Sequence, residues 1–224
     1  MNLSKSYEFF KPEDCGDRIH IIGCGAVGST LAENIARLGI TKISLYDFDK
    51  VEAHNIANQM FTEEDIGKLK TEAVKEMLVK INPEIEADIK LYNEGWKPGM
   101  RMSGYVFLCV DNIDLRREIA KSNQGNLSIK AMFDYRMRLT DAQHFASDWH
   151  DPQKVKNFLA TMAFSHDEAK EETPVSACNM TLSVAPTVRM IVAAGVANFM
   201  NFVKTKTMKN MIVLDAFSFV TDAF

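Results

Sequence analysis

The chain has 224 residues, of which 46% are hydrophobic, so it is long enough for one sizeable core and short for two. We therefore predict a single domain over residues 1–224. The net charge of −4 is spread in both signs along the chain, and so the composition argues against a nucleic-acid-binding protein and against attachment to an anionic membrane.

The cysteines and the apolar stretches bear on the compartment of the protein. Cys15, Cys24, Cys109 and Cys178 stand far apart without a CxxC pair, which argues against a structural zinc site and fits a reducing compartment. The N-terminal sequence lacks the apolar core of a signal peptide. The most apolar stretch, 190–203, is shorter than the about 20 residues that span a bilayer. We expect a cytoplasmic protein.

The first half of the chain predicts strands that alternate with helices. An apolar run at 19–22 ends in the glycine-rich turn GCGAVG, and apolar residues at helical spacing continue to Gly39. A second strand is predicted over 42–47, an amphipathic helix over 68–82, and a more polar strand, nearer an edge, over 84–92.

The same alternation continues over the next segments. Residues 105–110 are continuously apolar, as in a strand buried on both faces, and a helix at 114–123 and a strand at 128–137 follow. This order predicts an α/β fold with a Rossmann-like, doubly wound, mainly parallel sheet, whose nucleotide-binding core covers about residues 17–135.

After this core the pattern is looser. Residues 136–151 fit a ribbon or a loop, 152–164 a short helix, and 165–177 a charged loop without periodicity. A strongly apolar helix from 186 to about 204 and a last strand at 211–220 form a C-terminal extension of the fold.

The ends of the predicted strands carry candidate nucleotide-binding groups. Gly23, Gly25 and Gly28 form GxGxxG, which permits a tight turn and lets backbone amides approach phosphate oxygens at a helix N-terminus. Asp47 follows the second strand, where an acid accepts hydrogen bonds from ribose hydroxyls. Because ligands of such sheets lie beyond the carboxyl ends of the strands, these groups and Asp111 should meet in one pocket. NAD and ATP are both possible ligands at this point.

A polar loop favours ATP over NAD. A nicotinamide enzyme needs little more on this loop than the ribose acid, whereas residues 46–70 also place amides and a cation where a triphosphate could lie. These polar candidates are Asp49, Asn55, Asn58, Gln59 and Lys70. A solvated turn is the alternative explanation for the loop, and a helix cap is the alternative for Asp111.

Taken together, the motifs resemble those of the ubiquitin-activating enzyme superfamily, of ThiF, MoeB and HesA type. The glycine turn, DFD, HNIANQ, DIGKLK, INP and VDN occur in that family's order and near its spacing. The resemblance covers about 17–135 and, more loosely, 178–203. It implies an ATP- and Mg²⁺-dependent adenylyltransferase that acts on the C-terminal carboxylate of a ubiquitin-like or sulfur-carrier protein. It also implies a homodimer, in which 136–224 faces the acceptor or the second copy.

The resemblance also assigns roles to residues. It implies that the phosphates are lined by Gly23, Gly25, Ala26 and Gly28, and that Asp47 holds the ribose. Asn55 and Gln59 fall in the nucleotide loop with Asp49 and Asn58, Lys70 neutralises phosphate charge, and Asp111, with Asn112, faces Mg²⁺ and the nucleotide.

The chain departs from the family pattern at Asn58. The family's loop usually reads Asn-x-x-Arg-Gln, and its arginine meets the phosphates. We expect Arg136 or Arg138, just after the fifth strand, to replace it, and we expect Arg116 and Arg117 to lie at the surface or in helix packing.

Cys178 matches a family cysteine that in some members forms a thioester or an acyl disulfide with the activated protein. It is therefore a candidate nucleophile, although a buried packing role is the alternative. Two other functions stay open. One is adenylation of a tRNA base or a small peptide, and the other is a degenerate nucleotide-binding partner or scaffold.

Overall fold

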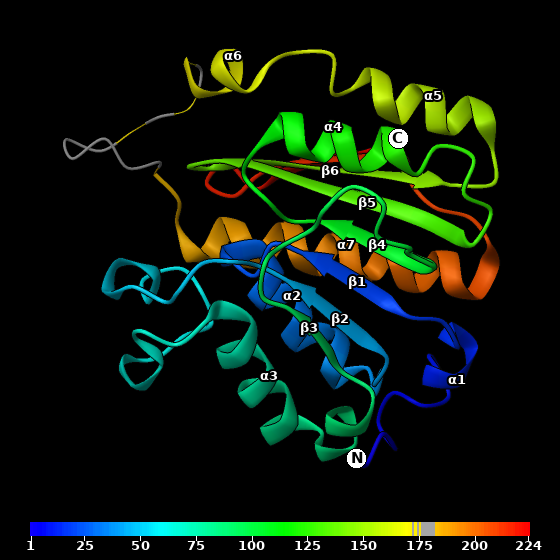
Figure 1. Ribbon diagram of the computed structural model, residues 1–224. Coiled ribbons are helices and arrows are strands. Elements are labelled where there is room, and N and C mark those ends of the chain that lie inside the picture. Colours follow the sequence, from blue (N-terminus) through cyan, green and yellow to red (C-terminus); the bar gives the residue numbers. More distant parts are fainter. Residues whose placement is uncertain (172, 174, 176–181) are drawn as a thin grey trace.

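An eight-stranded sheet forms the centre of the computed structural model, which describes residues 1–171, 173, 175 and 182–224 (Figure 1). The strand order is β3-β2-β1-β4-β5-β6-β7-β8, in which β3 to β5 run parallel and β6 to β8 are antiparallel. The strands are β1 (Ile19–Ile22), β2 (Ile43–Tyr46), β3 (Lys90–Tyr92), β4 (Gly104–Leu108), β5 (Ile129–Arg138), β6 (Asp141–Asp148), β7 (Met211–Asp215) and β8 (Val220–Ala223).

Helices cover both faces of this sheet. One face carries α2, α3 and α7, and the other carries α4, α5 and α6 (Figure 1). The helices are α1 (Pro12–Cys15), α2 (Ala26–Arg37), α3 (Lys70–Ile81), α4 (Ile113–Ser122), α5 (Pro152–Ala160), α6 (His166–Glu171) and α7 (Ala185–Thr205), with 3-10 turns η1 (Ala53–Asn55), η2 (Glu63–Asp65) and η3 (Pro83–Ala87). The fold is therefore the predicted Rossmann-like α/β fold with a C-terminal helix and antiparallel strands.

Three expected elements differ from what the sequence pattern indicated. The third strand is limited to β3, because the side chain of Asn82 accepts a hydrogen bond from the amide of Glu84 and starts η3 instead. The charged segment after α5 contains the short helix α6. The last strand is two strands, because Asp215 Oδ1 accepts from the amides of Phe217 and Ser218 and forms a turn between β7 and β8.

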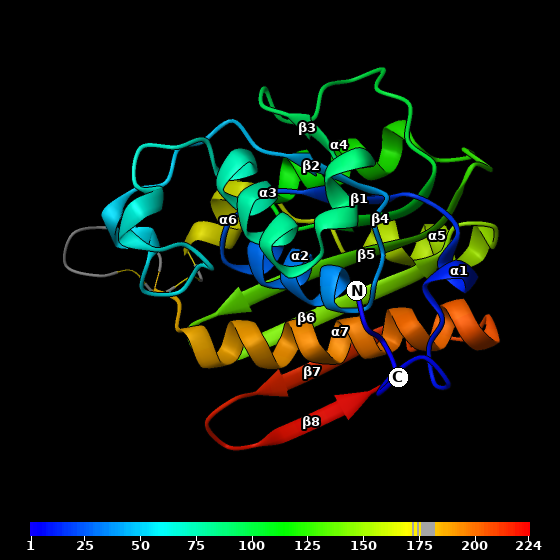
Figure 2. The same ribbon diagram turned by 90° about the horizontal axis from the view of Figure 1, so that it is seen from below.

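The apolar helix α7 runs along the sheet beside α2, as seen from below in Figure 2. It is the one helix in the described part of the chain that is long and apolar enough to cross a membrane, by length and composition only. More than half of its apolar window is buried, through residues such as Val188, Ile191, Val192 and Phe199. These side chains form the core between α7 and the sheet, which accounts for the apolarity of the helix.

Candidate functional site

The candidate site lies at the carboxyl ends of the parallel strands, at the left edge of the sheet in Figure 1. The glycine turn after β1, the polar loop between β2 and α3, and the segment after β4 meet at this edge, as the sequence pattern predicts. The start of α7 lies at the same edge (Figures 1 and 2). A ligand in this place would lie where open α/β sheets bind their ligands.

The glycine turn connects β1 to α2 with little room for side chains. Gly23 has a φ of +97°, and a Cβ on Gly28 would come within 1.8 Å of the carbonyl oxygen of Gly23. A Cβ on Gly25 would meet nothing within 4 Å, so the space above that residue is open. Gly25 is the N-cap of α2, and no side chain caps the helix. The amides of the first turn, which begins at Ala26, are therefore available to an anion.

Asp47 closes the other side of this turn. Its Oδ2 accepts a hydrogen bond from the amide of Cys24 at 2.6 Å, and its Oδ1 accepts from the amide of Asp49 at 2.9 Å. Burial raises the pKa of the Asp47 carboxyl above its ordinary value, while these two amides and the nearby Lys70 oppose the rise. The carboxylate thus holds the glycine turn and the polar loop together at the point where a ribose is expected.

The polar loop is ordered by its own side chains. Asn55 is buried, and its Oδ1 accepts from the amide of Glu52, which forms one half of a capping box around η1. The amides of Asn58 and Gln59 both bond the carbonyl oxygen of Asn55. Gln59 Oε1 is buried without a hydrogen-bond partner in the described part of the chain. A buried acceptor of this kind is costly unless a ligand or water satisfies it.

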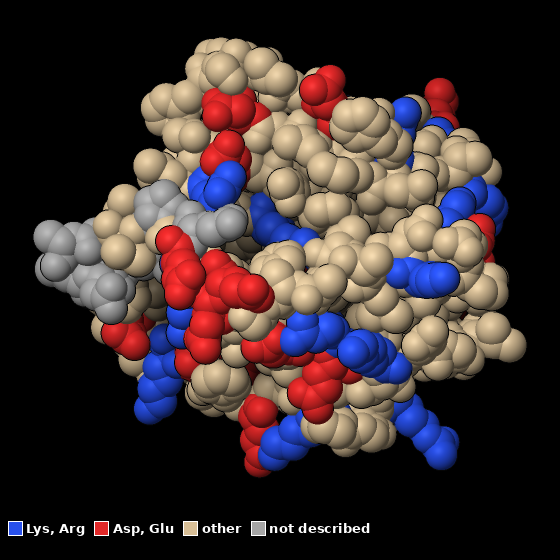
Figure 3. Space-filling view, turned by 90° about the horizontal axis from the view of Figure 1, so that it is seen from above, with Lys and Arg blue, Asp and Glu red and all other residues tan. Residues whose placement is uncertain are grey.

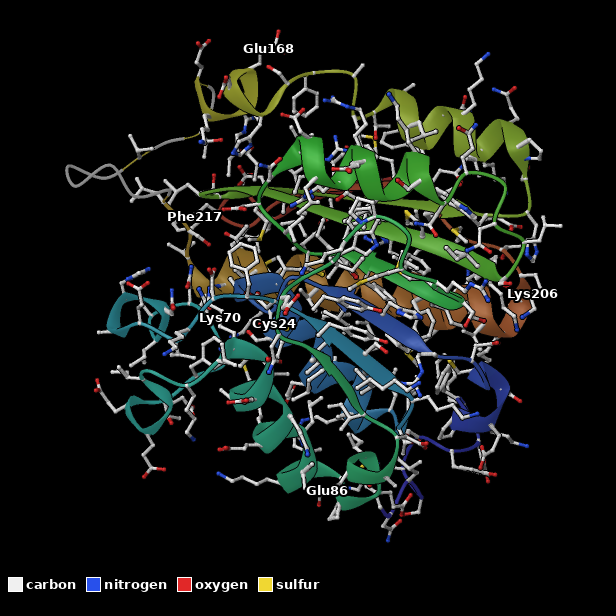
Figure 4. All side chains as sticks on the ribbon, in the orientation of Figure 1. Cys24, Lys70, Glu86, Glu168, Lys206 and Phe217 are labelled. Atoms are coloured by element: carbon white, nitrogen blue, oxygen red, sulfur yellow. The ribbon has the colours of Figure 1, made fainter. Side chains whose placement is uncertain are left out.

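Lys70, the first residue of α3, is the cation of this loop. Its side chain is 10% exposed, and its Nζ lies 2.9 Å from Oδ2 of Asp49. Lys70 and Cys24 lie near each other at the carboxyl edge in Figure 4, and the charge of Lys70 acts on the Cys24 thiol. The sequence did not show that Asp49 is the partner that orients this lysine.

The segment after β4 places Asp111 and Asn112 at the same edge. Asn112 is the N-cap of α4, and its Oδ1 accepts from the amide of Leu115 at 3.0 Å. The alternative explanation for Asp111, a helix cap, is therefore wrong. Asp111 itself is exposed. Within the described residues no three His, Cys, Asp or Glu side chains form a metal-binding cluster. A Mg²⁺ ion held by one carboxylate and by phosphate oxygens needs no such cluster.

The arginines near the site are mostly engaged by carboxylates. Arg116 is buried and forms an ion pair with Asp134, so its expected packing role is confirmed. Arg136 donates to Asp134 Oδ2 and to both oxygens of Thr161. Arg138 lies 3.7 Å from Asp141. The phosphate-neutralising role of Arg136 or Arg138 stays a prediction, and neither guanidinium is free of other partners.

Of the cysteines in the described part, Cys15 and Cys24 are buried and Cys109 is partly buried. Burial raises the pKa of the thiols of Cys24 and Cys109, and that of Cys15 to about 12. A thiol with a raised pKa is a poor nucleophile. Cys178, the candidate nucleophile, lies outside the described residues.

Two open hollows lie elsewhere, at the amino ends of the strands. One of about 640 Å³ lies under the N-terminal segment beside Leu3 and Gly39, and the other, of about 490 Å³, lies beside Trp96 and Asn123. Neither contains the residues of the glycine turn or the polar loop.

On the face seen from above, acidic and basic side chains are interspersed (Figure 3).

The residues at the carboxyl edge of the sheet are suited to bind a nucleoside triphosphate. The open space above Gly25 and the uncapped amides of α2 suit phosphate oxygens, and the buried Gln59 Oε1 can accept from an amino or hydroxyl group of the ligand. Asp47 and Lys70 supply an acceptor and a cation.

The sequence comparisons agree with this arrangement. A model of the ThiF family matches residues 16–222. Ubiquitin-like modifier-activating enzyme 5 of Drosophila simulans is 34% identical over 144 residues, which are 57% of this chain and 35% of that protein. The Drosophila virilis protein is 33% identical over 145 residues, with the same shares. The chain thus spans about a third of the length of these curated relatives.

Solved structures share the fold over almost the whole chain. E. coli MccB with MccA-N7isoASN has a TM-score of 0.71 and 17% identity, and E. coli MccB with ATP has 0.69 and 18%. PaaA has 0.71 and 16%. Each covers 95% of this chain, which in turn covers 65% of each of them. Because the family model covers the turn, the loop and the C-terminal extension alike, the chain belongs to the ThiF family, within the superfamily of ubiquitin-activating (E1) enzymes.

Proposed function

We propose that the protein uses ATP to adenylate the C-terminal carboxylate of a ubiquitin-like or sulfur-carrier protein, with transfer to a thiol as a possible second step. One observation carries the proposal. The segments at one edge of the sheet carry an uncapped helix N-terminus, a lysine, the ribose acid Asp47 and a buried amide oxygen, that of Gln59, without a partner among the described residues. The similarity to ubiquitin-like modifier-activating enzyme 5 supports the class of acceptor.

Adenylation requires that the carboxylate and ATP are positioned and that the charge on the phosphates is stabilised. A C-terminal carboxylate has a pKa of about 3.5 and is ionised at pH 7, so its attack requires no general base. The carboxylate oxygen bonds to the α-phosphorus, the bond from that phosphorus to the bridging oxygen breaks, and pyrophosphate leaves. The amides after Gly25 and the ammonium group of Lys70 would hold the phosphates during this step.

Asp111 is proposed to hold Mg²⁺. Its carboxylate is exposed at the carboxyl edge, and hard cations such as Mg²⁺ bind through one or two carboxylates together with substrate phosphates. The ion would supply charge neutralisation at the phosphates. We also propose a cytoplasmic homodimer, on the family resemblance alone.

Exchange of radiolabelled pyrophosphate into ATP tests the function. The unaltered protein, supplied with a small ubiquitin-like protein that ends in Gly-Gly, should catalyse exchange that depends on this acceptor. Asp111→Asn should abolish exchange while the circular dichroism spectrum and the melting temperature stay unchanged. Exchange at the normal rate in Asp111→Asn would remove this residue from the site. Binding of NADH in preference to ATP would overturn the proposal as a whole.

The second candidate is a nucleotide-binding partner or scaffold without the adenylation step. Asn58, which stands where the family usually has an arginine, favours it, and so does the ion pair that occupies Lys70. This candidate predicts ATP binding without any exchange. A small peptide is a further candidate acceptor. E. coli MccB, which shares the fold, has been solved with MccA-N7isoASN, and the exchange assay covers a peptide when one replaces the protein acceptor.

A further inference from the structure

Arg189, near the start of α7, reaches the polar loop. Its Nη1 lies 3.1 Å from the Sδ atom of Met60, although the two residues are 129 positions apart in the sequence. Thr187 Oγ1 donates to the carbonyl oxygen of Leu139 at 2.8 Å and fixes the start of α7 to the end of β5. The helix therefore presents Arg189 at the carboxyl edge, where Figures 1 and 2 both show the start of α7 near the loop.

Met60 is in turn linked to the glycine turn. The amide of Met60 donates to Ser29 Oγ at 3.1 Å, and Ser29 Oγ donates to the carbonyl oxygen of Gly25 at 2.7 Å. A series of contacts through Met60 and Ser29 therefore links the guanidinium of Arg189 to Gly25, at the uncapped start of α2. This is the place where the phosphates are expected.

The contact with Met60 leaves most of the guanidinium unused. A thioether sulfur is a weak acceptor, whereas a guanidinium has five N–H donors. Arg189 is exposed and forms no ion pair with any described residue, in contrast to Arg116, Arg136 and Arg138. Its planar fork of donors matches the oxygens of a phosphate group.

Neutralising a triphosphate at the polar loop requires one more cation than the loop supplies. A triphosphate carries several negative charges, and the ammonium group of Lys70 is already paired with Asp49. Position 58 on the loop carries a neutral asparagine. We propose that Arg189 contacts the triphosphate of ATP and supplies the guanidinium that the loop lacks at Asn58. This inference rests on the proposed function, because it requires that ATP is the ligand.

The test compares ATP with adenosine, which has the same base and ribose but no phosphates. We expect Arg189→Ala to weaken ATP binding by about tenfold or more, the loss of a charge-assisted pair, and to change adenosine binding by less than about twofold. Isothermal titration of the purified full chain at low and at high salt measures both affinities. The control is Arg37→Ala, on the same face but paired with Glu33, which should leave both affinities unchanged.

A rescue variant separates charge from structure. Asn58→Arg, added to Arg189→Ala, should restore ATP affinity, because it returns a guanidinium to the loop. An equal loss for ATP and adenosine in Arg189→Ala would mean that Arg189 only holds the Met60 segment in place, and would overturn the proposal. If Arg189→Ala bound ATP with unchanged affinity and still catalysed exchange, the inference about Arg189 would also be overturned, while the proposed function would stand. Failure of the unaltered chain to bind ATP would overturn both.

Discussion

At the scale of single residues, the site depends on how each charge is held. Asp49 illustrates this, because the sequence shows a carboxylate in a polar loop, and only the fold shows that it pairs with Lys70. Gln59 is similar, since its amide looks like any other polar residue until its oxygen is found buried without a partner in the described part of the chain. Such roles depend on three-dimensional neighbours and leave no periodic signal in the sequence.

Lys70 gives a first prediction at this scale. Lys70→Met should lower pyrophosphate exchange by about two to three powers of ten, the range observed when a pre-organised transition-state donor is removed. The melting temperature should change little, because the partner of Lys70, Asp49, has a side chain that is 52% exposed and can be hydrated when it is left alone. Exchange kinetics and calorimetry measure the two effects.

Lys68→Met is the matched control for Lys70→Met. Lys68 lies two residues away and pairs with Asp65 and Glu76, whereas Lys70 pairs with Asp49. Its loss should leave exchange unchanged. If Lys68→Met and Lys70→Met lowered exchange equally, the effect would come from general disturbance of the loop rather than from a phosphate contact.

At the scale of elements, the glycine turn offers two substitutions of the same size with opposite effects. Gly25→Ala adds a methyl group that meets no atom within 4 Å, so we expect the smaller loss of stability of the two. The methyl group would stand in the space expected for the phosphates and should lower ATP affinity by about tenfold or more, since each lost charge-assisted bond is worth about that factor.

Gly28→Ala is the counterpart. Its Cβ would lie 1.8 Å from the carbonyl oxygen of Gly23, which belongs to the backbone and cannot move without shifting β1 or α2. We expect a loss of stability of about 1–3 kcal/mol, typical of overpacking, measured by urea unfolding. If Gly25→Ala proved the less stable of the two, the assigned geometry of the turn would be contradicted.

The elements themselves show what a sequence pattern can and cannot predict. The buried strands and α7 follow from runs of apolar residues such as 105–110, because burial on both faces leaves a clear signal. The start of η3 at Asn82 and the turn after Asp215 depend on one or two hydrogen bonds that backbone amides donate to a side-chain oxygen. A hydrophobic repeat of two or 3.6 residues carries no information about such bonds.

The sequence pattern does not indicate the contact between Arg189 and Met60 for a related reason. Its one sequence signal is a charged residue near the start of a mainly apolar helix.

At the scale of the whole molecule, the buried histidines couple stability to pH. His144, in β6, is fully buried and lies against the rings of Phe133 and Tyr135, and burial lowers its pKa from 6.5 to about 4. Burial lowers the pKa of His20 to about 4 as well, helped by the charge of Arg18. Both imidazoles are therefore neutral in the folded protein near neutral pH, and the unfolded chain takes up protons first on acidification.

The sign of the effect follows from this difference. Between pH 6.5 and pH 4 the unfolded state binds more protons than the folded state, so the free energy of unfolding falls as the pH falls, and the loss is complete below about pH 4. For His144 the loss is at most about 3 kcal/mol, at 1.36 kcal/mol per pKa unit. Asp47, whose pKa is raised, acts in the opposite sense, so the contribution of His144 is best isolated by a variant.

His144→Phe keeps an aromatic ring in the same place and removes the titrating group. We expect its free energy of unfolding, from urea titrations at pH 7 and pH 4.5, to fall less on acidification than that of the unaltered protein. His54→Phe is the control for replacing a histidine by phenylalanine outside the core, because the side chain of His54 is 53% exposed. The same pH dependence in His144→Phe and in the unaltered chain would show that the imidazole of His144 takes up its proton without unfolding, and that the packing of α7 over the sheet admits a charge there.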